Sequence, residues 1–148
     1  MQICQSMALC TLTRRVTFAA AHRYRRPDWD DARNEATFGP CAWPHFHGHS
    51  YVCDVTVSGD IDPLTGFVVD LGVLDAILRR EVHDRFDHRN INLDVPEFAD
   101  GKLVPSGENL ARFICERVSE AMRTDGMTAR VTTVSISEDP SLRATYAA

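Results

Sequence analysis

The 148-residue sequence has no long apolar run, no excess of basic residues and no C-x-x-C pair. No apolar stretch approaches the roughly 20 residues that a membrane-spanning helix needs. The N-terminus lacks the basic start and long apolar core of a signal peptide. The net charge of -5 argues against a nucleic-acid-binding protein, because that function favours a basic face. A local basic pocket for a small anionic substrate remains compatible with this charge.

The cysteines are odd in number, five in all, which fits poorly with a disulfide framework. A reducing, cytoplasmic location is therefore the simplest expectation. A free cysteine is most often a small buried hydrophobic residue, and no function is needed for Cys4, Cys10, Cys53 or Cys115. Cys41 differs because it lies in a loop, beside a glycine and a proline, that leads into a histidine-rich segment.

The chain length fits one domain that can bury its own core. We expect residues 1–10 to form a flexible N-terminal extension, with Met7 as an alternative start, and residues 11–148 to form the single domain. No internal repeat or low-complexity segment is visible.

Hydrophobic periodicity predicts strands at 11–21 and 46–59, helices at 71–85 and 106–124, and strands at 129–137 and 142–147. Ser106 is the expected N-cap of the second helix. In the first strand only Arg14 departs from an otherwise apolar face. Strands grouped on either side of a helix pair favour an α+β fold with an antiparallel sheet. Four strands leave open sheet edges, which favours oligomers formed by edge pairing.

Residues 23–44 are predicted to form a long polar loop between the first two strands. Loops of this length inside compact domains are usually functional or mobile.

The segment from Cys41 to Tyr51 carries the clearest chemical signal. His47 and His49 are two residues apart on a strand, so they share a face with Cα atoms roughly 7 Å apart. His22 ends the preceding strand, and pairing of the two strands would bring it beside them. Three histidines with an open fourth position are typical of a catalytic zinc site. His45 is a weaker competitor for the same role.

Other ionisable residues are candidates for supporting roles. A nearby metal or imidazolium would lower the pKa of Cys41 and favour its thiolate. Asp87 and His88 form a carboxylate–imidazole pair that could relay a proton, although such pairs are common on surfaces. Glu108 near a helix start and Glu138 at a strand end could grip a ligand, but either could equally be a solvated terminus. His83 is expected to be solvated on the first helix.

Together these residues resemble the family of 6-pyruvoyl-tetrahydropterin and 6-carboxytetrahydropterin synthases, over residues 16–146. The matching segments are FAAAH at 18–22, Asn34 with FGPC at 38–41, HGHSY at 47–51, GDIDPLTGFVVD at 59–70, FDHRNIN at 86–92, PSGEN at 105–109 and SED at 137–139.

The resemblance implies a tunnelling fold, an antiparallel four-stranded sheet with two helices on one face, in the order ββααββ. It also implies trimers built by joining sheets, two of which commonly stack into a hexamer, with active sites between subunits. The expected partners are therefore further copies of the chain and a small-molecule substrate, with no nucleic acid and no membrane.

By the same resemblance, His22, His47 and His49 hold Zn²⁺, which binds the side-chain hydroxyls of 7,8-dihydroneopterin triphosphate. Cys41 resembles the general base. Asp87 and His88 resemble its relay partners, reaching in from a neighbouring subunit. Glu138 resembles the anchor of the pterin ring, and Glu108 supports the same pocket.

The resemblance leaves two alternative products for such a zinc-dependent lyase. One is 6-pyruvoyl-tetrahydropterin, formed with release of triphosphate. The other is 6-carboxy-5,6,7,8-tetrahydropterin, formed with additional loss of acetaldehyde and used in queuosine and 7-deazaguanine biosynthesis. The five residues between Cys41 and His47 resemble the pyruvoyl branch, whereas Ser106 and Gly107 replace the threonine or other side chains usual there.

Two readings from other classes remain. A non-catalytic pterin-binding zinc protein would not need Cys41, Asp87 and His88 together. A three-histidine iron oxygenase fits less well with the helix pair and the short strands.

Overall fold

The computed structural model describes residues 9–148. Its helices and strands are, in order, β1 (Leu9–His22), α1 (Asp31–Phe38), β2 (His47–Asp60), α2 (Leu71–Leu78), α3 (Asp84–Phe86), β3 (Arg89–Asn90), α4 (Ile91–Asp94), α5 (Gly107–Thr124), β4 (Arg130–Asp139) and β5 (Leu142–Ala147). Strand β1 begins at Leu9, so residues 9 and 10 belong to the sheet. The rest of the expected N-terminal extension lies outside the described residues.

The strands form one sheet in the order β3-β1-β2-β4-β5. The pairs β1–β2, β2–β4 and β4–β5 are antiparallel, and β1 pairs with β2 along its whole length, from Leu9 opposite Asp60 to His22 opposite His47. The α+β class and the four predicted antiparallel strands are confirmed. The sheet has a fifth strand that was not predicted, because β3 adds a short parallel strand at the outer edge of β1. Two residues are too few to show a strand period in the sequence.

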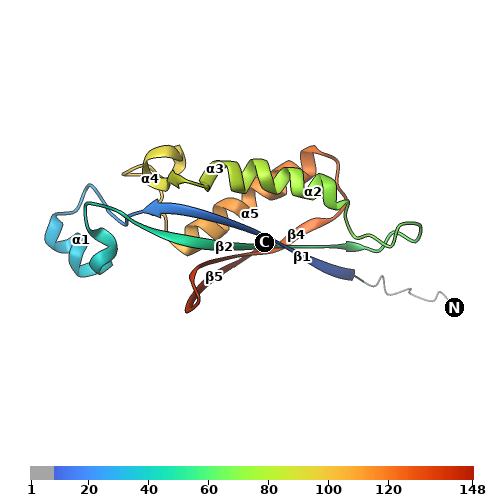
Figure 1. Ribbon diagram of the computed structural model, residues 1–148, viewed down its shortest axis with the longest axis horizontal. Helices are drawn as coiled ribbons and strands as arrows, with labels where there is room; N and C mark the ends of the chain where they lie inside the picture. The colour runs from blue at the N-terminus through green and yellow to red at the C-terminus, as the bar shows by residue number, and fades with distance from the viewer. Residues whose placement is uncertain (1–8) are drawn as a thin grey trace.

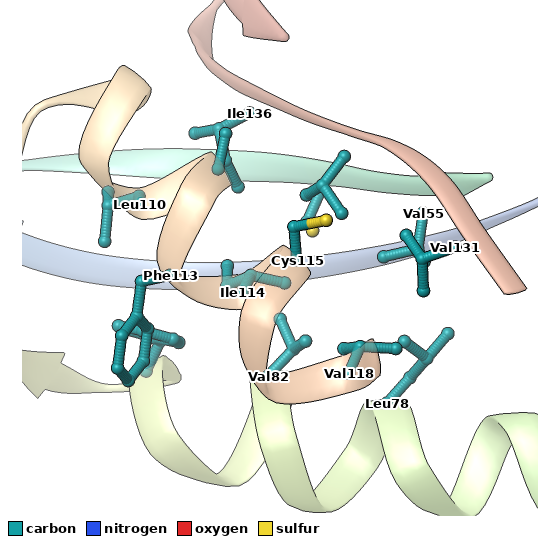
Figure 2. Packing of buried hydrophobic residues seen from close by; sticks show 14 of the residues in the cluster. Val55, Leu78, Val82, Leu110, Phe113, Ile114, Cys115, Val118, Val131 and Ile136 are labelled. Carbon is teal, nitrogen blue, oxygen red and sulfur yellow. The ribbon is translucent and has the colours of Figure 1, made fainter. Parts of the chain in front are cut away.

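Helices α2 and α5 lie on the same side of the sheet (Figure 1). Apolar side chains from both helices meet the inward side chains of β2 and β4 in one core, where Leu78, Val82, Ile114 and Ile136 are almost fully buried (Figure 2). In residues 9–148 no helix is long and apolar enough to cross a membrane.

The predicted loop at 23–44 is wrong in part, since it contains α1 and a 3₁₀ turn, Gly39–Ala42. The Asp30 side chain caps α1 by accepting from the Arg33 N–H at 2.7 Å. Asn34, fully buried, accepts from the Arg26 N–H at 2.8 Å and donates to the Arg26 carbonyl at 3.0 Å. A polar side chain therefore anchors this helix, and it has no apolar stripe for the sequence to reveal.

The predicted helix at 71–85 is present as α2, a π-helical turn (Arg79–His83) and α3. Arg14, the exception on the apolar face of β1, donates through Nε and Nη2 to the two carboxylate oxygens of Asp75 in α2, both at 2.7 Å. The charged residue on that face therefore pairs with the helix that covers it. The second helix begins after Ser106 as predicted and ends at Thr124.

Candidate active site

Three histidines from β1 and β2 meet at one end of the sheet. Register alone accounts for this, because His22 is paired with His47 and Ala20 with His49, so all three side chains project from the same face. One nitrogen from each ring lies within 4.8 Å of the others. The ring centroids are 4.6 Å apart for His22 and His47, and 5.1 Å apart for His47 and His49.

His22 is fully buried and has a fixed orientation. Its Nδ1 lies 2.9 Å from the carbonyl oxygen of Pro105 and 3.0 Å from the hydroxyl of Tyr51. Since a carbonyl only accepts hydrogen bonds, Nδ1 carries the proton and Nε2 keeps its lone pair. Burial, reinforced by the neighbouring His47, lowers the pKa of His22 to about 4. The ring is therefore neutral near pH 7, as a metal ligand must be.

His49 supplies the most specific sign of a metal site. Its Nε2 is buried and has no hydrogen-bond partner, with Glu138 Oε2 the nearest carboxylate oxygen at 3.8 Å. A buried polar atom without a partner is costly, so such an atom in a histidine cluster fits the chemistry of a metal ligand. Burial, with the adjacent His49, also lowers the pKa of His47. The three residues together could hold a metal ion.

His45 is excluded from this cluster, so its expected place on the face of His47 is wrong. The strand begins only at His47, and Phe46 before it has a φ of 61°, in the left-handed region. That turn breaks the alternation and leaves His45 exposed. The Arg23 guanidinium stacks on the Phe46 ring, 4.7 Å from its centroid, and donates to the Pro44 carbonyl at 3.3 Å. Arg23 thus fixes the approach to β2.

Cys41 lies in the 3₁₀ turn and is partly buried. Its carbonyl accepts from the Tyr24 N–H at 2.8 Å, and the Tyr24 hydroxyl donates to Glu138 Oε1 at 3.0 Å. Burial raises the pKa of the Cys41 thiol, and the Glu138 carboxylate adds to this effect. The protein groups alone therefore favour the neutral thiol, in the direction opposite to the shift that a metal or imidazolium would produce.

Glu138 ends the inward face of β4 and is buried, with 8% of its surface exposed. It lines a pocket of about 160 Å³ together with Glu108 and Gly107 from the start of α5. The remaining lining residues come from the β1–α1 segment, β4 and β5, and are Tyr24, Ile136, Leu142, Arg143, Ala144 and Thr145. The structure therefore brings both predicted glutamates to one pocket beside the histidine cluster.

Asp87 and His88 lie elsewhere, at the β3 edge. Asp87 accepts from the Ala19 N–H at 3.0 Å and from His88 Nδ1 at 2.7 Å. His83, which was expected to be solvated, also places its Nε2 3.4 Å from Asp87. The His88 side chain is 85% exposed and borders a hollow whose lining also includes Ala19, Ala21 and His49. Among residues 9–148, no hydrogen bond or ion pair joins Asp87 or His88 to His22, His47 or His49 of the same chain.

Sequence reasoning missed two tyrosines of the site. Tyr51 is two residues after His49, and Tyr24 is two residues after His22. The same two-residue spacing that joins His47 to His49 could have identified both as neighbours of the cluster.

The chain is similar to known proteins over most of its length. A family model described as 6-pyruvoyl tetrahydropterin synthase matches residues 11–148. The human 6-pyruvoyl tetrahydrobiopterin synthase is 38% identical over 111 residues, covering 75% of each chain. A 6-carboxy-5,6,7,8-tetrahydropterin synthase of Bacillus subtilis is 33% identical over 88 residues, covering 58% of this chain and 56% of its own.

The solved structure of Caenorhabditis elegans 6-pyruvoyl tetrahydropterin synthase superposes with a TM-score of 0.87 and 34% identity, covering 96% of this chain and 97% of that one. Sequence and structure therefore agree along almost the whole chain, which belongs to the 6-pyruvoyl tetrahydropterin synthase family.

Proposed function

We propose that this protein is a zinc-dependent lyase that converts 7,8-dihydroneopterin triphosphate into 6-pyruvoyl-tetrahydropterin and triphosphate. The observation that carries the proposal is the buried, unpartnered His49 Nε2 within the histidine cluster, directly beside the Glu138 pocket. A metal site and a carboxylate suited to a donor-rich heterocycle are thereby adjacent. The names of the human and nematode relatives support the same activity.

Zinc suits this donor set, because three neutral imidazoles with an open fourth position are typical of catalytic zinc. His22, His47 and His49 would hold the ion, and the bound ion would polarise the substrate's side-chain hydroxyls and acidify the adjacent C–H.

The protein's own residues supply the remaining functions. Glu138 accepts hydrogen bonds from the amino and ring N–H groups of the pterin, and Glu108 borders the same pocket. Cys41 takes the proton from the side-chain carbon.

Asp87 and His88 complete the site from a neighbouring copy of the chain. They lie at the β3 edge, whereas the Glu138 pocket includes Arg143 and Thr145 of β5 at the opposite edge. Joining the β3 edge of one sheet to the β5 edge of the next would bring these elements together and cover both open edges. Repetition of that contact gives a closed ring, in agreement with the trimer or hexamer expected from the sequence. The four cysteines within residues 9–148 form no disulfide, which fits a cytoplasmic location.

One experiment tests the activity and separates its two branches. The zinc-loaded protein is incubated with 7,8-dihydroneopterin triphosphate, and the products are identified by mass spectrometry. We expect triphosphate and the 6-pyruvoyl product. A 6-carboxy product with acetaldehyde would select the other branch, and absence of turnover would exclude both. Cys41→Ala is expected to keep zinc and lose turnover, so full activity in this variant would contradict its role as the base.

A further inference from the structure

Tyr24 contacts three parts of the site at once. Its hydroxyl donates to Glu138 Oε1 at 3.0 Å, and its backbone N–H donates to the Cys41 carbonyl at 2.8 Å. Its ring meets the His22 ring edge-on, with centroids 5.0 Å apart.

Glu138 lies between the histidine cluster and Tyr24. Oε2 lies 3.8 Å from the unpartnered Nε2 of His49, while Oε1 is held by Tyr24 beside the pocket. A carboxylate is itself a good zinc ligand. If Glu138 could turn freely, it could close the open position of a metal bound to the histidines, and it would then be lost to the pocket.

We propose that Tyr24 is a positioning residue whose hydroxyl keeps the Glu138 carboxylate directed at the pocket, where it receives the pterin ring, and away from the metal position. This inference rests on the proposed function, because it takes Glu138 as the pterin anchor. It explains how the Glu138 carboxylate stays available to the pterin ring although it lies next to the metal position.

The test uses Tyr24→Phe, which removes the hydroxyl and keeps the ring and the backbone N–H. Neopterin affinity is measured by fluorescence titration of the zinc-loaded protein, and zinc affinity by competition with a chelator. We expect neopterin to bind about tenfold more weakly, the scale of one charge-assisted hydrogen bond, with zinc affinity equal or higher. Tyr146→Phe is the matched control, because Tyr146 of β5 packs against the core, and it is expected to change neither affinity.

A double-mutant cycle that combines Tyr24→Phe with Glu138→Gln separates failure of this inference from failure of the proposed function. If Tyr24 acts through the carboxylate, Tyr24→Phe weakens binding in the wild-type background and has little effect beside Glu138→Gln. Unchanged neopterin affinity in Tyr24→Phe, or an equal loss in both backgrounds, would overturn the positioning role and leave the anchor intact. Wild-type affinity in Glu138→Gln would overturn the anchor, and the role of Tyr24 with it. Both substitutions keep side-chain shape, and thermal unfolding checks that each variant is folded.

Discussion

His22 Nδ1 and the carbonyl oxygen of Pro105 lie 2.9 Å apart, which couples the end of strand β1 to the segment that leads into helix α5. This contact fixes the tautomer of His22 and leaves Nε2 free for a metal. The carbonyl is held in place by its neighbours, since Asn109 Nδ2 donates to the Val104 carbonyl at 2.8 Å and Ser106 caps the helix.

Removal of the Asn109 amide should therefore weaken metal binding although Asn109 is not a ligand. We expect Asn109→Ala to lower the free energy of unfolding by about 1 kcal/mol and zinc affinity by roughly tenfold. The control is Asp70→Ala, which removes the N-cap of α2, where Asp70 accepts from the Gly72 N–H at 2.8 Å. It should cost about 1 kcal/mol with unchanged zinc affinity. Equal zinc affinity in the two variants would contradict the coupling.

Gly39 is expected to control the placement of Cys41. Its φ of 57° and ψ of -140° suit glycine, and its N–H donates to the Glu35 carbonyl at the end of α1. We predict that Gly39→Ala costs about 1–3 kcal/mol and changes the rate at which iodoacetamide alkylates Cys41, measured by peptide mass spectrometry.

The control for that substitution is Gly66→Ala, with a φ of 75° in the turn after β2. An added Cβ would meet no atom within 4 Å at either glycine, so backbone strain accounts for both costs. Gly66→Ala should leave the alkylation of Cys41 unchanged, and a similar change in both variants would show that Gly39 has no local role.

Glu81 should stabilise the fold in a pH-dependent way. It is buried, and burial alone would raise its pKa, but Arg80 and Arg117 outweigh this and lower it. Because the folded state binds the proton less tightly than the unfolded state, the stabilisation is present above the ordinary glutamate pKa and is lost as pH falls through the lowered value.

We therefore expect Glu81→Gln to lower the free energy of unfolding by about 1–3 kcal/mol at pH 7, measured by urea denaturation. The difference from wild type should shrink as pH falls below the ordinary glutamate pKa. Glu116→Gln removes an exposed partner of Arg112 on α5 and should have little effect. A difference for Glu81→Gln that does not vary with pH would contradict the charge-based account.

The sequence was informative where side-chain periodicity and register decide the outcome. The spacing of His47 and His49 and the position of His22 predicted a cluster that the pairing of β1 with β2 produces. The sequence was uninformative where polar contacts determine the local structure. Helix α1 is an example, because it depends on buried Asn34. His45 was misplaced because the positive φ of Phe46 has no signature in residue type.

The contribution of Asp87 and His88 could not be deduced from one chain alone. Asp87 is bound to the Ala19 N–H at the β3 edge, and the His88 side chain is exposed there. Their proposed role in a neighbouring copy of the chain came from the family resemblance, because residue spacing within one sequence does not specify a contact between subunits.

The most direct test of the central claim is the metal content of the purified protein and of two histidine variants, measured by inductively coupled plasma mass spectrometry after zinc loading and desalting. We expect about one zinc ion per chain in the wild type and close to none in His49→Ala. His45→Ala, in the exposed residue that precedes β2, is the matched control and should retain the ion. Retention of zinc by His49→Ala, or its loss from His45→Ala alone, would contradict the assignment of the site.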